Sequence, residues 1–171
     1  MTTRFRIELL GRRPRSTFAC GDAALDRYFA ELVSQDIRRG LASCFVVVDK
    51  ATERIAGFYT LAATSIAVSD LPDEMVRRLP RYPTVPAALV GRLAIDLGFK
   101  RQGLGRALLG NAAARAARSE VAAYALVVDA ANGAAAAYYA AIGFRPLATR
   151  ATSLFLPLAL VAKALPTGDP A

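Results

Sequence analysis

One stretch decides the fold: Leu93-Ala94-Ile95-Asp96, the turn Lys100-Arg101-Gln102-Gly103-Leu104-Gly105-Arg106, and Ala107-Leu108-Leu109 directly after it. The apolar residues before the turn predict a strand over 88–96, and the alanines and leucines after it predict a helix from Gly103 to about Arg118. The glycines let backbone N–H groups point into one concavity, to which the helix adds the positive end of its dipole. This strand–turn–helix unit suits an anion.

Two known phosphate-binding patterns do not fit this turn. Gly98 and Gly103 match the glycines of a P-loop, but Leu104 stands where that loop needs lysine. A dinucleotide fingerprint needs glycine or alanine where Leu108 stands, and Asp129 is a poor ribose ligand. From these residues alone, a tight turn that binds no ligand stays open as the alternative.

The pattern continues on both sides of this unit. After it, we predict a strand over 124–129, a helix over 132–142 stopped by Gly143, and a last strand over 154–160 that Pro157 interrupts or ends, with a frayed tail from Pro166. Before it, we predict a helix capped by Asp22 that runs to Val33, resumes to Arg39 and ends at Gly40. Strands over 43–48 and 55–68, with Gly57 at a bulge, and a short helix over 73–79 follow. Since no repeat or linker separates these elements, we expect a single α/β domain over 1–171.

The composition excludes several classes of protein. Of the 171 residues 54% are hydrophobic and 21% charged, which is typical of a globular chain, and charged residues or prolines break every apolar stretch that could cross a membrane. The N-terminus lacks the apolar core of a signal peptide, and two cysteines make no disulfide framework, so we expect a cytoplasmic protein. The absence of histidine removes Ser-His and Cys-His nucleophile pairs and argues against a zinc site. A net charge of +8 favours polyanionic ligands or serves solubility.

The turn resembles the coenzyme A signature of the GNAT acetyltransferase superfamily, Arg/Gln-x-x-Gly-x-Gly/Ala. It aligns as Lys100-Arg101-Gln102-Gly103-Leu104-Gly105, with Lys100 as the departure because it keeps the charge and loses the guanidinium fork. Asn132, Ala135, Tyr139 and Gly143-Phe144 resemble the second signature of the family. The resemblance implies the GNAT acyl-CoA N-acyltransferase fold, with a single mixed central sheet flanked by helices, acetyl-CoA as co-substrate, and no metal.

The resemblance also implies where the coenzyme binds. The pantetheine arm would pair with the backbone of Leu93, Ala94 and Ile95, where one N–H would polarise the thioester carbonyl. The pyrophosphate would lie on the amides of the turn, whose residues are Lys100, Arg101, Gln102, Gly103, Leu104, Gly105 and Arg106. Asn132 either bonds to the coenzyme near its thiol or caps the helix that follows.

Tyr139 is the predicted proton donor for the departing thiolate. A phenol with a pKa of about 10 is protonated at neutral pH, and the spacing to Gly143-Phe144 selects Tyr139 over its neighbour Tyr138. The alternative is that Tyr139 only packs. No clear general base is present, since Asp96 and Asp129 stand at strand ends and serve equally well as caps. An α-amine, with a pKa near 7.7–8.0, needs less help to lose its proton than a lysine, with a pKa near 10.4. The absence of a clear general base therefore favours an α-amine acceptor.

A closer resemblance covers nearly the whole chain. The runs Phe18–Tyr28, Gly57–Leu61, Leu71-Pro72, Arg77–Pro83 and Gly91–Ala94 resemble the acetyltransferase toxins of bacterial toxin–antitoxin pairs. This implies that the chain acetylates aminoacyl-tRNA and so blocks translation, that a ribbon-helix-helix antitoxin neutralises it, and that it forms a homodimer. Separate groups of basic residues could bind a phosphate backbone or serve as a solvated surface. The predicted tRNA contacts are Arg38, Arg39, Arg77, Arg78 and Arg92. The alternatives are a general acetyltransferase for small amines or protein N-termini, and a module that binds coenzyme A or a partner without turnover.

Overall fold

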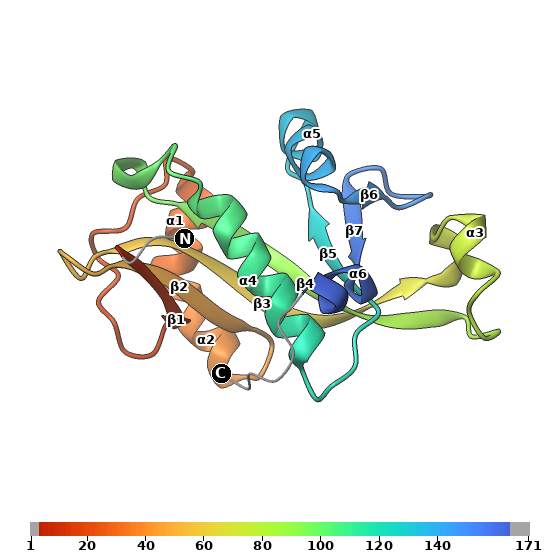
Figure 1. Cartoon of the computed structure of the whole chain (residues 1–171). Helices are drawn as coiled ribbons and strands as arrows, with labels where there is room; N and C mark the ends of the chain where they lie inside the picture. The colour runs from red at the N-terminus through yellow and green to blue at the C-terminus, as the bar shows by residue number, and fades with distance from the viewer. Residues whose placement is uncertain (1–3, 165–171) are drawn as a thin grey trace. The chain divides into compact units, whose positions relative to one another are not determined.

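The structure, a computed structural model, describes residues 4–164 as an α/β protein with seven strands in one sheet (Figure 1). The strands are β1 (Phe5–Leu9), β2 (Ser43–Asp49), β3 (Ile55–Ala67), β4 (Thr84–Ile95), β5 (Ala125–Asp129), β6 (Arg145–Pro146) and β7 (Ser153–Pro157). The α-helices are α1 (Ala23–Arg27), α2 (Val33–Arg38), α3 (Asp73–Val76), α4 (Leu104–Arg118), α5 (Gly133–Ile142) and α6 (Leu158–Ala164). A π-helical turn, η1 (Tyr28–Leu32), joins α1 to α2, and two 3-10 turns are η2 (Val68–Asp70) and η3 (Leu97–Phe99).

The strand order is β1-β2-β3-β4-β5-β7-β6, so the prediction of an α/β fold with a single central sheet is confirmed. The chain forms two compact units. Of the described residues, the first unit holds 4–62 and 90–112, and the second holds 63–89 and 113–164. Strands β3 and β4 contribute to both units, and each unit is described by itself below. That the units make a single domain over 1–171 stays a prediction.

In the first unit, side chains alternate between the two faces of the sheet, as the period of a β-strand requires. Val46, Val48, Phe58 and Ala94 share a buried cluster with Tyr28, Phe29 and Val33 of the α1–η1–α2 segment. Tyr59 has the opposite parity and donates a hydrogen bond to Asn111 of α4 at 2.7 Å. The two helical segments therefore pack on opposite faces of these strands.

The bulge expected at Gly57 is present in the pairing of β2 with β3. The register passes from Val47 opposite Gly57 to Val48 opposite Ile55, so one residue of β3 is extra. A Cβ at Gly57 would stand 3.0 Å from the carbonyl oxygen of Ala94 and 2.7 Å from the end of Ile95. Gly57 thus permits the close approach of β4 at Ala94 and Ile95.

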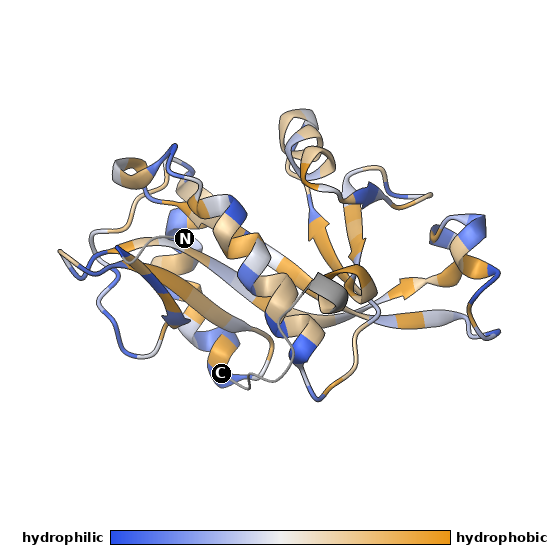
Figure 2. Cartoon of the chain, viewed as in Figure 1, coloured by the Kyte–Doolittle hydropathy of each residue, from blue (hydrophilic) through white to orange (hydrophobic). Residues whose placement is uncertain are grey.

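In the second unit, the core lies between β5, β7 and the residues before and after α3. Buried Ala125, Val127 and Phe155 pack with Ile66, Leu71, Val85 and Leu147. Figure 2 shows β5 and β7 in the colour of hydrophobic residues, while α3 is largely hydrophilic. Asp70 is buried and accepts hydrogen bonds from the backbone N–H of Thr149, at 3.1 Å, and from the Thr149 hydroxyl.

Two ends of the chain differ from the sequence-based expectation. The pattern of Phe5–Leu9 did not predict β1, which pairs antiparallel with β2 from Phe5 opposite Asp49 to Leu9 opposite Phe45. Of the two alternatives for the last strand, that it ends at Pro157 is confirmed, and its continuation over 158–160 is wrong, because Leu158–Ala164 is helix α6. Pro157, which cannot donate to a ladder, closes β7, and the alanine- and leucine-rich residues after it favour helix. The tail predicted to fray from Pro166 lies outside the described residues.

No helix within residues 4–164 is both long and apolar enough to span a bilayer. This finding concerns only that part of the chain.

Candidate functional site

The end of β4 and the residues after it form the predicted coenzyme site in the first unit. Ala94 is buried, while Leu93 and Ile95 are partly buried on the opposite face of the strand. Past the strand, Asp96 donates its backbone N–H to Ala56 at 2.8 Å, and η3 carries the chain to the turn. The structure therefore brings the predicted pantetheine segment and the predicted phosphate turn together in one unit.

Asp96 shapes this loop and is not available as a general base. Its buried carboxylate accepts the N–H of Gly98 at 2.8 Å and the N–H of Ala19 at 3.1 Å, and it faces the guanidinium of Arg54 at 3.6 Å. Of the two interpretations of Asp96, base or cap, the geometry supports the cap. Both oxygens are used to fix the entry to the turn.

The turn itself has the backbone geometry of an anion site. Gly103 has φ +76° and Arg101 has φ +64°, both in the left-handed region, so the chain reverses within a few residues before α4. The first intrahelical bond runs from the N–H of Ala107 to the carbonyl of Gly103, at 3.1 Å. The amides of Leu104, Gly105 and Arg106 precede that bond and stand at the positive end of the helix dipole.

Cationic side chains lie beside these amides. Lys100, Arg101, Gln102 and Arg106 are exposed, and Nη1 of Arg4 donates to Oε1 of Gln102 at 3.4 Å. The guanidinium carbons of Arg4 and Arg54 lie 5.9 Å and 5.4 Å from the ring centroid of Phe99. Sequence reasoning missed Arg4 and Arg54, because Arg4 directly precedes β1 and Arg54 lies in the β2–β3 hairpin, both far from the turn in sequence.

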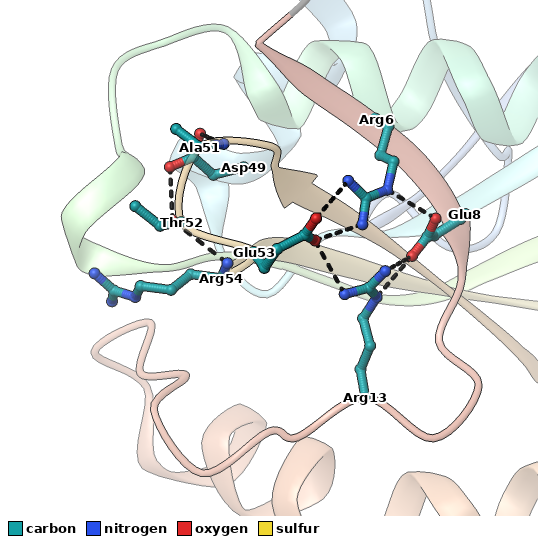
Figure 3. Close-up of polar contacts among 8 residues, drawn as sticks. All are labelled: Arg6, Glu8, Arg13, Asp49, Ala51, Thr52, Glu53 and Arg54. Carbon is teal, nitrogen blue, oxygen red and sulfur yellow. Dashed lines mark hydrogen bonds and ion pairs between the residues drawn. The ribbon is translucent and has the colours of Figure 1, made fainter.

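The hairpin that carries Arg54 is held to β1 by ion pairs, which Figure 3 shows. Arg6 contacts Glu8 at 3.0 Å and Glu53 at 2.5 Å, and Arg13 contacts both carboxylates as well. Hydrogen bonds from Arg6 and the nearby charges of Arg6 and Arg13 lower the pKa of Glu53. Glu53 itself has φ +58°, a conformation that this tight turn requires.

Tyr139 lies in the second unit, on α5. It is partly buried, whereas Tyr138 is 45% exposed, as the rotation of about 100° between neighbouring helix positions predicts. The Tyr139 ring meets Phe144 edge-on, with the centroids 5.9 Å apart. Burial, and then the negative charges of ionised Tyr138 and Asp129, raise the pKa of Tyr139. The phenol therefore keeps its proton throughout the neutral range.

The other predicted residues of the second unit have structural partners. Asn132 caps α5, since its Oδ1 accepts the N–H of Ala135 at 2.9 Å; the geometry favours this interpretation over a coenzyme contact. Asp129 is exposed and accepts a hydrogen bond from the hydroxyl of Ser153 at 2.6 Å. Within residues 4–164 no three His, Cys, Asp or Glu side chains form a group that could hold a metal ion.

The arginines chosen as tRNA contacts divide between the two units. Arg38 ends α2, Arg39 follows it, and Arg92 lies in β4, all exposed in the first unit. Arg77 and Arg78, also exposed, follow α3 in the second unit.

A substitution at Gly105 tests whether the turn binds the coenzyme. Changing Gly105 to leucine places a large side chain on the second residue of α4, where a phosphate must approach the backbone. We expect acetyl-CoA affinity, measured by calorimetry, to fall at least about tenfold, roughly 1.4 kcal/mol. Gly103 is a poorer test, because at φ +76° any side chain strains the backbone.

Gly110→Leu is the matched control, since Gly110 lies in the same helix and a Cβ there meets nothing within 4 Å. This variant should bind acetyl-CoA like the wild type. Equal affinity of folded Gly105→Leu and wild type would remove the turn from the coenzyme site.

Comparisons with known proteins agree with this geometry. The model of the Acetyltransferase (GNAT) domain matches residues 40–146. A protein named tRNA-acetylating toxin, from Mycobacterium tuberculosis (strain ATCC 25618 / H37Rv), is 33% identical over 131 residues, which cover 75% of this chain and 76% of that protein.

Solved structures match over almost the whole chain. AtaT complexed with acetyl-methionyl-tRNAfMet has a TM-score of 0.86 and 26% identity, covering 94% of this chain and 98% of that one. AtaTR bound with AcCoA has a TM-score of 0.80 and 26% identity, covering 95% and 99%. A mutant AtaT toxin bound to the C-terminus of the antitoxin AtaR has a TM-score of 0.79 and 25% identity, covering 96% and 99%.

Proposed function

Because this chain belongs to the GNAT family of acetyltransferases, we propose that it transfers the acetyl group of acetyl-CoA to the α-amine of aminoacyl-tRNA as the toxin of a toxin–antitoxin pair. The observation that carries the proposal is the likeness, over 94% of the chain, to a toxin solved with an acetylated aminoacyl-tRNA. The relative named tRNA-acetylating toxin supports the same acceptor.

The residues of the first unit fit acetyl-CoA. The amides of Leu104, Gly105 and Arg106 with Lys100 and Arg101 suit a pyrophosphate, since they combine the N–H donors of a helix N-terminus with positive charge. The coenzyme supplies an activated thioester. In our proposal the backbone of Leu93, Ala94 and Ile95 pairs with the pantetheine arm, and one N–H there stabilises the charge that develops on the carbonyl oxygen.

Tyr139 completes the transfer in this proposal. The amine nitrogen bonds to the acetyl carbon, the carbon–sulfur bond breaks, and the sulfur receives the phenolic proton of Tyr139, while the new amide loses a proton to solvent. The raised pKa of Tyr139 supports this role, since the proton is present at neutral pH. Asp96 is occupied by backbone amides, so an acceptor that is already partly neutral, such as an α-amine, suits the site.

We also propose the finer features that accompany this activity. They are a ribbon-helix-helix antitoxin as partner, a homodimer as the oligomeric state, and the cytoplasm as the compartment. AtaT bound to part of its antitoxin supports an antitoxin partner for this chain. Light scattering would test the dimer, and co-expression with the product of a small neighbouring gene would test the antitoxin.

One assay separates the proposed function from its alternatives. Thiol release from acetyl-CoA is followed with aminoacyl-tRNA, free amino acids and N-terminal peptides, and the products are identified by mass spectrometry. We expect efficient acetylation of charged tRNA only. Efficient reaction with peptides or small amines, and none with charged tRNA, would make the chain a general acetyltransferase, while binding of acetyl-CoA without turnover on any acceptor would leave a non-catalytic module.

Arg78→Ala tests the arginines of the second unit as phosphate contacts. Loss of one contact should raise the KM for aminoacyl-tRNA severalfold and lower the salt slope of log(kcat/KM) by about 0.7–0.9, because each neutralised phosphate releases counterions. Affinity for acetyl-CoA should stay unchanged. Steady-state kinetics over a salt series measures both effects, and activity on a small neutral amine should barely respond to salt.

Arg27→Ala is the control for Arg78→Ala. Arg27 is also exposed, but Glu31 pairs with it at 3.2 Å, so its charge is already partly compensated. An Arg78→Ala variant with the KM and salt slope of Arg27→Ala would exclude Arg78 from the acceptor site.

A further inference from the structure

The helix that follows Asp22 contains a π turn, which the sequence did not predict. The N–H of Val33 bonds to the carbonyl of Tyr28, five residues earlier, so η1 is wider than the α-helical turns on either side. Within it Tyr28 and Phe29 are both buried. Such single wide turns occur frequently at functional sites.

The π turn aligns Tyr28 with Asp36. In a regular α-helix, residues eight apart are rotated by about 80° from each other. The wide turn takes up one extra residue, so Asp36 is aligned as if seven positions away, about 20° off the same line. The Tyr28 hydroxyl accordingly donates a hydrogen bond to Oδ2 of Asp36 at 2.7 Å, which fixes the orientation of the ring. Burial and this bond raise the pKa of Tyr28, so the hydroxyl remains a donor.

The guanidinium of Arg92 lies over this fixed ring. Its guanidinium carbon is 3.7 Å from the ring centroid of Tyr28, a close stacking distance. Its backbone N–H donates to Oγ1 of Thr60 at 3.1 Å, and Thr60 is buried. Both the backbone and the guanidinium plane of Arg92 are therefore held.

The hydrogen-bonding edge of Arg92 is nevertheless unused. Within the described residues the guanidinium has no hydrogen-bond or ion-pair partner, and Arg92 is exposed. A guanidinium that stacks on an aromatic ring through one face keeps the N–H donors along its edge available for hydrogen bonds. A planar fork held in this way matches two oxygens of a phosphate or carboxylate.

The position of Arg92 in β4 separates it from the coenzyme phosphates. Leu93, Ala94 and Ile95 lie between Arg92 and the loop that leads to the turn, a span of about 10 Å at 3.3 Å per residue. Arg92 thus stands at the end of the proposed thioester segment that is away from the pyrophosphate amides. Because this end is away from the coenzyme phosphates, we assign an anion bound there to the acceptor. Aminoacyl-tRNA carries phosphodiesters next to its esterified end.

We propose that Arg92 binds a phosphodiester of the acceptor RNA near its aminoacylated end, and that Tyr28 and Asp36 are positioning residues that hold its guanidinium flat. This inference rests on the proposed function, which supplies the acceptor. It adds a specificity element, because acceptors without a phosphate at that place leave the fork unpaired. Tyr28 acts only through Arg92.

A double-mutant cycle on the full-length enzyme tests this assignment. Arg92→Ala should raise the KM for aminoacyl-tRNA about tenfold, with kcat within about twofold of wild type and a salt slope lower by about 0.7. Arg92→Lys should recover only part of the loss, since lysine keeps the charge without the fork. Tyr28→Leu should raise KM about threefold to fivefold, and should add nothing in the Arg92→Ala background.

Tyr28→Phe and Asp36→Asn guard against misfolding of Tyr28→Leu, because they keep the ring and remove the hydroxyl or the charge that fixes it. Each should raise KM by about twofold to threefold and lose this effect when Arg92 is alanine. Thermal melting checks that each variant is folded, and calorimetry checks that it binds acetyl-CoA. If Tyr28 had a purely structural role, its substitutions would raise KM in the Arg92→Ala background as well. Such additive effects on KM would overturn the positioning role.

The outcomes distinguish this inference from the proposed function. If wild-type enzyme does not acetylate charged tRNA, the proposed function fails, and the RNA phosphate site fails with it. If wild type acetylates charged tRNA and Arg92→Ala keeps the same KM and salt slope, only the phosphate site is overturned. If Arg92→Ala changed the KM for free amino acids or peptides as much as the KM for charged tRNA, the Arg92 guanidinium would be assigned to a carboxylate instead of a phosphate.

Discussion

Tyr139→Phe is expected to lower turnover about 10²–10⁴-fold, the range that a general acid contributes, while acetyl-CoA affinity survives. The substitution removes one hydroxyl and leaves the ring packed against Phe144. Single-turnover kinetics with saturating aminoacyl-tRNA measures the loss, and calorimetry measures coenzyme binding. Because burial raises the pKa of Tyr139 above that of an ordinary phenol, wild-type kcat should show no fall from this group near neutrality.

Tyr138→Phe is the matched control. Tyr138 is the adjacent tyrosine of α5 and is 45% exposed, so its phenol should be dispensable and turnover should stay within a few-fold of wild type. Expression of the wild-type and Tyr138→Phe enzymes should arrest growth, and expression of Tyr139→Phe should not. If both variants remain active, or both fail alike, the assignment of the proton donor to Tyr139 is wrong.

Phe29→Ala is expected to lower the free energy of unfolding by about 3–5 kcal/mol, a large share of the roughly 5–15 kcal/mol that a domain possesses. Phe29 is 1% exposed and stacks on Phe58 with the ring centroids 4.2 Å apart, and Phe18 meets both rings edge-on. Truncation therefore opens a cavity between the π turn and β3. Urea unfolding followed by circular dichroism measures the loss.

Ile37→Ala controls for truncation of an apolar residue in the same helical segment. Ile37 lies in α2 and is 40% exposed, so its loss should cost well under half as much. This buried cluster also contains Ala94, which belongs to the segment proposed to pair with the pantetheine arm. A Phe29→Ala protein as stable as Ile37→Ala would show that these rings do not carry the stability of the first unit.

Local signals explain what the sequence predicted correctly. The strand, the glycine turn and helix α4 follow from hydrophobic spacing and from Gly103, whose positive φ the turn requires. The caps Asp22 and Asn132 accept backbone N–H groups two or three residues later, so each was visible within a short window. The difference between Tyr138 and Tyr139 likewise follows from helix geometry alone.

The sequence by itself determined the order of these elements, the glycine turn before α4 and the family resemblance, because each depends on residues that are neighbours along the chain. Tertiary structure alone decided what depends on distant pairing. Edge strand β1 exists through its ladder with β2, about forty residues later, and Arg4 reaches the turn only through that ladder. The stack of Arg92 on Tyr28 joins residues 64 positions apart, and no local propensity encodes it, because a π turn and a strand must first pack together to form it.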